Sequence, residues 1–142
     1  RHEIFLKKKN ISFINDSKAT SFESTKYALK NNRNIYWIFG GFPKIRDKFN
    51  FQGISSNIIK SFIIGRKTTY FKNQIKKKLK YKISYNLKNA INDVFKELLL
   101  IKNNKATVLL SPASASYDQF NNFVHRGNQF KKIVRYNVKK FL

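Results

Sequence analysis

Apolar and polar residues follow one another along the chain in short blocks that predict strands and helices. Unbroken apolar runs at residues 35–39 and 108–110 are typical of strands buried on both faces of a sheet. Two apolar segments flank the turn Lys7-Lys8-Lys9-Asn10 and predict an N-terminal β-hairpin. The predicted strands are residues 3–6, 11–14, 35–39, 61–64, 81–84 (an edge strand) and 108–110.

Apolar residues at three- and four-residue spacing predict helices between these strands. Two spacings of a hydroxyl with Glu or Gln, Thr20 with Glu23 and Ser116 with Gln119, predict capping boxes at helix starts. The predicted helices are residues 21–30, 55–59, 68–78, 87–101 and a long final helix beginning after Ser116. In that last helix, one side is predicted to carry Phe120, Phe123, Val124, Gly127, Phe130, Val134 and Val138.

Apart from the hairpin, strands and helices alternate, and this order predicts an α/β fold. We expect a Rossmann-like, mostly parallel sheet of about six strands, with helices on both faces and the β-hairpin at its start. Neither a linker nor an internal repeat divides the chain, so residues 1–142 are interpreted as one domain. In such sheets, ligands bind outside the carboxyl ends of the strands.

Three polar segments follow predicted strands and are therefore expected to lie along one edge of the sheet. They are residues 16–20, 40–44 and 111–116, and each by itself could be an ordinary turn or helix cap. Lys44 follows two glycines and is either a solvated lysine or a residue that binds a carboxylate. Asp16 either starts a helix or accepts a hydrogen bond from a ribose hydroxyl. Hydroxyls and backbone N–H groups at a helix start favour an anion. His125 is interpreted as a surface residue.

The charge balance adds a second possible function. The chain has 30 Lys and Arg residues against 7 Asp and Glu, a formal net charge of +23, so a nucleic-acid partner must be considered. The lysines are spread along the whole chain, however, and accompany many Asn, Ile, Phe and Tyr residues, which A/T-rich codons encode. We therefore do not expect nucleic acid as the partner, but a basic nucleic-acid-binding α/β module stays open as the alternative, with residues 76–78 as its best feature.

Several chemistries are excluded by composition. The chain has no cysteine and two histidines far apart, so no metal site built from side chains is expected. No apolar run approaches the roughly 20 residues of a membrane span, and no signal peptide precedes the first strand, so we expect a soluble cytoplasmic protein without a membrane partner. Neither G-x-x-x-x-G-K-[ST] nor G-x-G-x-x-G is present, and no catalytic residue is predicted.

The polar segments also contain sequence motifs similar to those of a known family. Four motifs carry the similarity: Asn15-Asp-Ser-Lys-Ala-Thr20, Gly40-Gly-x-x-Lys44, Leu110-Ser-Pro-Ala-Ser-Ala-Ser116 with Asp118-Gln-Phe-Asn-Asn-Phe123, and Arg126-Gly127. Together they resemble the C-terminal domain of the UDP-N-acetylmuramoyl-L-alanine:D-glutamate ligases, the MurD family. The resemblance covers essentially the whole chain. Arg1 and Glu3 resemble the Arg and Glu of the family's His-Arg-x-Glu segment, so we expect the chain to be a piece of a longer polypeptide. Ile45 departs from the family's glycine, and Ser114 from its usual cysteine.

The resemblance implies an ATP-dependent amide ligase of peptidoglycan synthesis, and so of cell shape and division, that adds D-glutamate to UDP-N-acetylmuramoyl-L-alanine through an acyl phosphate. It implies that ATP and Mg are held mainly by a central domain that, like the UDP-binding domain, is absent from this chain, so the fragment alone is expected to be an inactive monomer. The implied D-glutamate-binding residues are Thr20, Lys44, Ser116, Tyr117 (through its backbone) and Phe123. The implied ATP-binding residues are Arg1, Asp16 and Lys18. A related ligase that adds another amino acid remains a third possibility.

Overall fold

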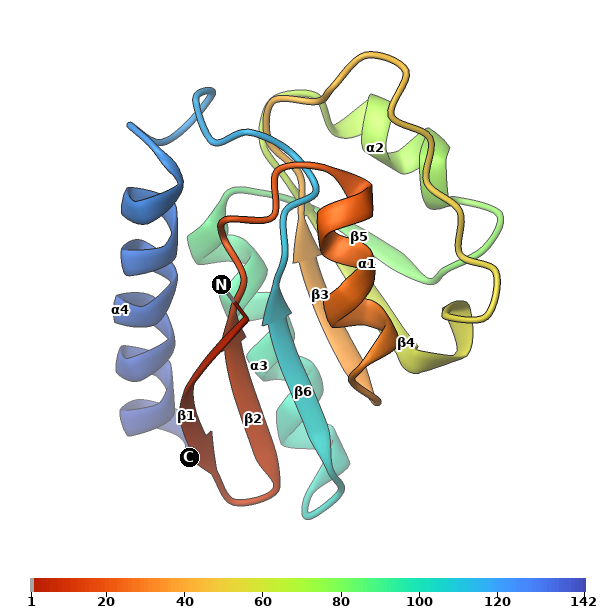
Figure 1. The fold of residues 1–142 in the computed structure, drawn as a ribbon. Coiled ribbons are helices and arrows are strands. Elements are labelled where there is room, and N and C mark those ends of the chain that lie inside the picture. The colour runs from red at the N-terminus through yellow and green to blue at the C-terminus, as the bar shows by residue number, and fades with distance from the viewer. Residues whose placement is uncertain (1) are drawn as a thin grey trace.

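A computed structural model, which describes residues 2–142, contains a six-stranded sheet in the order β1-β2-β6-β3-β4-β5 (Figure 1). β1 pairs with β2 in antiparallel register, and all other neighbours are parallel. The α/β fold with an N-terminal hairpin predicted from the sequence is thereby confirmed. The strands are β1 (Glu3–Lys8), β2 (Ile11–Asn15), β3 (Ile35–Phe39), β4 (Ile58–Ile64), β5 (Tyr81–Tyr85) and β6 (Ala106–Leu110).

Helices cover both faces of the sheet because successive residues of each central strand point to opposite sides. In β3, Tyr36 and Ile38 belong to the core under α3 and α4, whereas Trp37 belongs to the core under α1 and α2. Figure 1 shows α1 on one side of the sheet and α3 on the other. The helices are α1 (Phe22–Lys30), α2 (Thr68–Ile75), α3 (Leu87–Ile101) and α4 (Phe123–Phe141), with a 3₁₀ turn at Ser55–Asn57.

The last helix begins later than the sequence predicts. α4 starts at Phe123 and is capped by Asn122, whose side chain accepts from the His125 N–H at 2.8 Å. Gln119 does not close a capping box with Ser116, because its side-chain amide donates to the Tyr85 carbonyl at 3.0 Å. The predicted cap is therefore wrong. Three members of the predicted apolar stripe also differ, since Phe120 precedes the helix and Phe123 and Val124 are 38% and 54% exposed.

Smaller boundary differences have local causes. α1 is capped by Ser21, whose hydroxyl accepts from the Ser24 N–H at 3.2 Å, and not by Thr20. The turn of the hairpin is shorter than predicted because β1 continues to Lys8. The segment predicted as a helix at 55–59 is a single 3₁₀ turn that leads directly into β4, and α2 ends at Ile75. Among residues 2–142, no helix has both the length and the apolar composition that crossing a membrane requires.

Candidate functional site

Three loops leave neighbouring strands at the same edge of the sheet, which we call the rim. They are the first loop (residues 16–21, after β2), the second loop (residues 40–54, after β3) and the third loop (residues 111–122, after β6). β6 lies between β2 and β3, so the carboxyl ends of these strands are adjacent. Figure 1 shows the three loops side by side at the top of the sheet. The rim predicted from the sequence is therefore present.

The first and third loops are joined through Asp16, which is 2% exposed. Its backbone N–H donates to the Leu110 carbonyl at 2.7 Å. The Ser111 hydroxyl donates to Asp16 Oδ2 at 2.7 Å, and the His2 N–H donates to Oδ1 at 3.1 Å. Both carboxylate oxygens thus accept a hydrogen bond within the domain, although each keeps a second lone pair. Asp16 holds the ends of β2 and β6 together.

The second and third loops pair as a short antiparallel bridge. Phe42 and Ala115 exchange backbone hydrogen bonds of 2.8 and 3.0 Å. At Gly41, a Cβ atom would lie 2.4 Å from the Ala115 carbonyl oxygen, so only glycine allows this approach. Because Lys44 closely follows Phe42 and Ser116 adjoins Ala115, the two candidate residues sit on loops held against each other at the same edge.

The first loop is tied to α4 by a fully buried arginine. Arg126 donates from Nε to the Ser17 hydroxyl at 2.9 Å and from Nη2 to the Ser17 carbonyl at 2.7 Å. The Ser17 hydroxyl in turn donates to the Phe123 carbonyl at 2.7 Å. Among residues 2–142, Nη1 has no hydrogen-bond partner. Desolvation lowers the pKa of Arg126 to about 10, against the opposing effect of the Asp118 charge, so the side chain remains a cation at neutral pH.

The backbone around Lys44 is fixed by neighbours from two helices. Asp47 Oδ2 accepts from the Phe22 N–H at 2.9 Å and so places a carboxylate at the start of α1. From α2, the Tyr70 hydroxyl reaches the Lys44 carbonyl at 3.2 Å, and the Gln74 amide donates to the Asp47 carbonyl at 2.9 Å. The Lys44 side chain is exposed, but the loop that carries it is held at both α1 and α2.

We expect Asp47→Ala to lower the free energy of unfolding by about 1 kcal/mol, the usual effect of losing a carboxylate that accepts at a helix start. Urea denaturation gives this value, and amide hydrogen exchange at Phe22 should become faster. Asp47→Asn is the matched control because it keeps an oxygen acceptor and removes only the charge. An Asp47→Ala protein with unchanged stability and unchanged Phe22 exchange would contradict the proposed role of the carboxylate.

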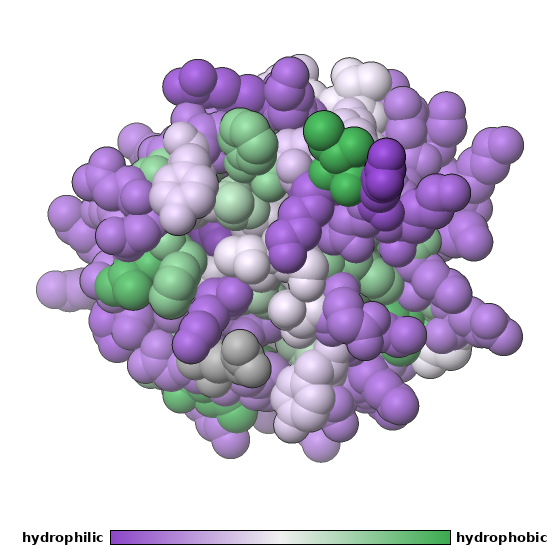
Figure 2. Space-filling view, turned by 45° about the horizontal axis from the view of Figure 1, so that its top comes forward, coloured by the Kyte–Doolittle hydropathy of each residue, from purple (hydrophilic) through white to green (hydrophobic). Residues whose placement is uncertain are grey.

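The remaining predicted site residues also lie on the rim. Ser116 is 3% exposed and Thr20 is half-buried, whereas the Tyr117 side chain is 73% exposed. The ammonium of the exposed Lys18 lies 6.0 Å from the centroid of the Phe123 ring, which places side chains of the first loop and α4 next to each other. Arg1 lies outside the described residues. Figure 2 shows weakly polar residues near the middle of this side of the molecule, surrounded by hydrophilic ones.

Sequence reasoning missed the residues that hold the loops in place. Ser17, Asp118 and Arg126 are parts of the family motifs but were not predicted to be site residues, and neither was Asp47. Asp118 Oδ2 accepts from the Arg66 N–H at 3.1 Å and so ties the third loop to the end of β4. The family motifs that contain Ser17, Asp118 and Arg126 were the one available signal. The contacts themselves could not be predicted because the partners lie far away in the sequence.

Comparison with known proteins agrees with this geometry. The chain is 41% identical over 130 residues to the UDP-N-acetylmuramoylalanine–D-glutamate ligase of Wolbachia sp. subsp. Brugia malayi, and 39% identical over 139 residues to that of Fusobacterium nucleatum subsp. nucleatum. The alignments cover 92% and 94% of this chain. The chain belongs to this ligase family. A third ligase, from Rickettsia prowazekii, is 37% identical over 126 residues, or 89% of this chain.

The family resemblance predicted from the rim motifs is thereby confirmed for a part of the ligase. The chain spans 26%, 32% and 28% of the length of these three ligases, respectively. No protein-family model matches the chain. The roles of Thr20, Lys44, Ser116, Tyr117 and Phe123 therefore stay predictions, as do those of the residues implied to bind ATP.

Proposed function

We propose that residues 1–142 form the C-terminal, D-glutamate-binding domain of an ATP-dependent ligase that adds D-glutamate to UDP-N-acetylmuramoyl-L-alanine in peptidoglycan synthesis. The observation that carries the proposal is the joining of three loops along one edge, through the Asp16–Ser111 hydrogen bond and the Phe42–Ala115 bridge, in a relative of these ligases. The cation and the hydroxyls implied to hold the substrate lie on these loops.

D-glutamate is a dicarboxylate, and the rim offers groups that suit it. We assign one carboxylate of D-glutamate to the Lys44 ammonium. The hydroxyls of Thr20 and Ser116 and the backbone at Tyr117 would form hydrogen bonds with the substrate, and Phe123 would contact it. The exposed Lys44 side chain, on a loop held by α1 and α2, can bind an incoming anion without first breaking an ion pair within residues 2–142. Charge-assisted hydrogen bonds of this kind are stronger than neutral ones.

The first loop is assigned to the nucleotide. We propose that Asp16, Lys18 and Arg1 reach ATP across a domain boundary, while ATP and Mg are held mainly by parts of the ligase outside this chain. Lys18 is exposed and suits a phosphate, and Asp16 can accept from a ribose hydroxyl with its unused lone pairs. ATP held there would give its γ-phosphate to the alanine carboxylate and leave as ADP. The D-glutamate amine would then attack the resulting acyl phosphate, which would form the amide and release inorganic phosphate and a proton. Such a ligase works in the cytoplasm, where ATP is present.

This domain would hold the D-glutamate amine in position and would not itself transfer a proton. An amine held beside its acyl acceptor reacts as if at very high local concentration, and the loops fixed by Asp16, Asp47 and Arg126 would supply that orientation. The chain alone, without the groups that activate the carboxylate, is expected to be inactive and monomeric.

We expect Lys44→Ala to weaken D-glutamate binding to the 142-residue chain by about tenfold or more, the loss expected for one charge-assisted hydrogen bond. NMR titration of the ¹⁵N-labelled chain measures this, with L-glutamate as the stereochemical comparison. Lys48→Ala is the matched control, because Lys48 is an exposed lysine on the same loop that no role has been assigned to. Equal binding by both variants would contradict the assignment of Lys44.

The same protein tests the two competing functions. If the chain is a nucleic-acid-binding module, oligonucleotide affinity should fall steeply with salt and should depend on residues 76–78, an exposed lysine run after α2, and not on Lys44 or Ser116. If it belongs to a ligase for another amino acid, that amino acid should displace D-glutamate in the titration. Either result would replace the proposed function.

A further inference from the structure

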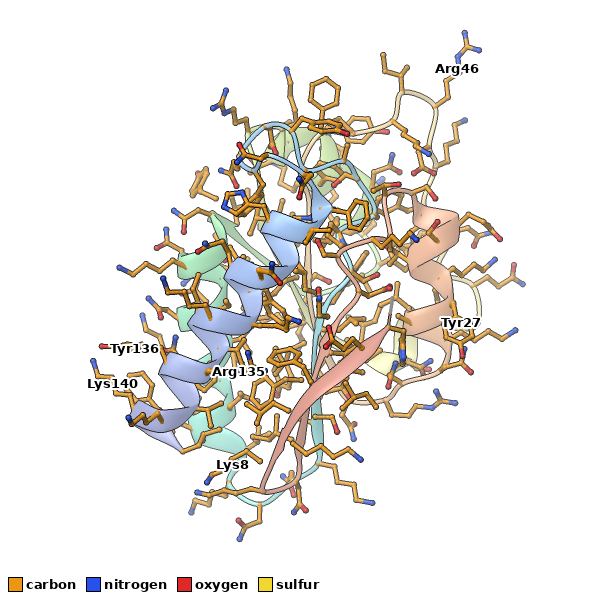
Figure 3. The ribbon with its side chains drawn as sticks, turned by 60° about the vertical axis from the view of Figure 1, so that its left-hand side comes forward. Lys8, Tyr27, Arg46, Arg135, Tyr136 and Lys140 are labelled. Atoms are coloured by element: carbon orange, nitrogen blue, oxygen red, sulfur yellow. The ribbon has the colours of Figure 1, made fainter. Side chains whose placement is uncertain are left out.

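A groove of about 840 Å³ opens between α3 and α4, on the outer side of the two helices. Its floor includes Phe95 and Ile133, which pack against the core of the sheet. Its walls include Leu99, Tyr136 and Phe141, which are 50%, 66% and 42% exposed. Figure 3 shows Tyr136 projecting outward from α4. An apolar strip between the two helices therefore remains open to solvent.

The groove is a built feature of the helix pair. The rings of Phe95 and Phe141 lie 6.3 Å apart and join α3 to α4 beneath it. Phe95 also stacks on Phe13 of the sheet at 5.9 Å, so the floor is anchored to β2. An apolar surface with a fixed floor is suited to receive an apolar partner without rearrangement, which lowers the entropy lost on binding.

The groove is also lined by cations. Four lysines border it, and none of them forms an ion pair within residues 2–142. The ammonium of Lys140 instead lies 5.3 Å from the centroid of the Phe141 ring. Within the described part of the chain, no Asp or Glu lines the groove. The lysines are Lys88 and Lys96 on α3, and Lys132 and Lys140 on α4.

The carboxylates of α3 point elsewhere. Asp93 pairs with Lys82 at 2.9 Å and accepts from the Ser84 hydroxyl at 2.8 Å, both on β5. Glu97 pairs with Lys60 of β4 at 3.1 Å. One side of α3 therefore carries carboxylates in ion pairs, whereas the side toward the groove carries Lys88 and Lys96, which form no ion pair with any described residue. The high net charge of the chain explains many lysines but not this separation.

We infer that the groove docks an acidic amphipathic helix of a partner protein. A helix laid between α3 and α4 would bury apolar residues at three- and four-residue spacing against Leu99, Ile133 and Phe141. Its flanking Asp and Glu side chains would meet the lysines on both walls. Nucleic acid would use the lysines but not the apolar strip, and a second copy of this chain would bring further positive charge to a groove that is already positive.

The test uses fluorescence anisotropy with a labelled synthetic helix of about 15 residues, which is roughly as long as the groove walls. The helix carries a Leu stripe flanked by Glu. We expect Leu99→Gln in the 142-residue chain to weaken its binding about tenfold or more. Leu100→Gln, at a neighbouring leucine that is 78% exposed but does not line the groove, should leave binding unchanged.

The charge contribution has a matched control of its own. The triple variant Lys96→Gln, Lys132→Gln, Lys140→Gln should weaken binding and reduce its salt dependence. The triple variant Lys76→Gln, Lys77→Gln, Lys78→Gln removes the same charge outside the groove and should bind as the unmodified chain does. Circular dichroism confirms that each variant is folded before it is scored.

Two outcomes would overturn the inference. Equal loss from the two triple variants, with no difference between the leucine variants, would mean general attraction of a polyanion to a basic protein. Displacement of the peptide by a single-stranded oligonucleotide together with an unaffected Leu99→Gln variant would assign the lysines to nucleic acid. Neither result depends on D-glutamate, so this test and that of the proposed function can fail separately.

Discussion

Gly40→Ala is expected to destabilise the protein by about 3–5 kcal/mol, a large share of the total stability of a domain. Gly40 has φ +121°, a conformation that side chains rarely adopt, and an added Cβ would lie 2.1 Å from the backbone oxygen of Ile64. The backbone strain and the forced separation of β3 from β4 each contribute about 1–3 kcal/mol. Urea denaturation at 25 °C gives the difference, and the second loop should lose its amide protection.

Gly53→Ala separates the two causes. Gly53 also has positive φ, +78°, but a Cβ there meets no atom within 4 Å. Gly53→Ala should therefore lower the free energy of unfolding by about 1 kcal/mol through backbone strain alone, because the added Cβ causes no steric clash. If both variants show the same decrease in the free energy of unfolding, the close approach of Gly40 to β4 has no energetic role, which contradicts the predicted steric effect.

Arg126→Ala is expected to lower the free energy of unfolding by about 3 kcal/mol and to release the first loop. The variant leaves a cavity and removes two charge-assisted hydrogen bonds to Ser17, whose carbonyl would become a buried acceptor without a donor. Relief of the buried charge offsets part of this loss, which is why the value is not larger. Hydrogen exchange should become faster at Ser17 and Ala19, whose N–H groups donate to the Asn15 side chain and the Asp16 carbonyl, whereas exchange in β4 should change only with global stability.

Arg126→Met tests whether hydrogen bonding or packing dominates. Methionine fills much of the space but donates nothing, so we expect it to release the first loop nearly as much as alanine does. A methionine variant with protected Ser17 and Ala19 amides would show that Arg126 acts by volume alone. In the proposed ligase, loosening this loop should weaken ATP binding more than D-glutamate binding. The reason is that Ser17 lies between Asp16 and Lys18, which are assigned to ATP.

Elements with a dense local pattern are the ones that could be predicted. α3 has the predicted bounds, residues 87–101, because its apolar residues recur at helical spacing and Asn86 caps it by accepting from the Asn89 N–H. β3 also has the predicted bounds, as an apolar run followed by two glycines. The predicted start of α4 is wrong because the Gln119 side chain donates to the carbonyl of Tyr85, 34 residues earlier in the chain.

By itself, the sequence determined the alternation of strands and helices, the three polar loops after strands and the family to which the motifs point, since these depend on residues close together in the chain. The tertiary structure decided that β6 lies between β2 and β3, and hence that the three loops touch. It also decided that Arg126 holds Ser17, 109 residues away. Such contacts arise from the packing of the complete sheet and its helices, which imposes no local spacing on the residues that meet.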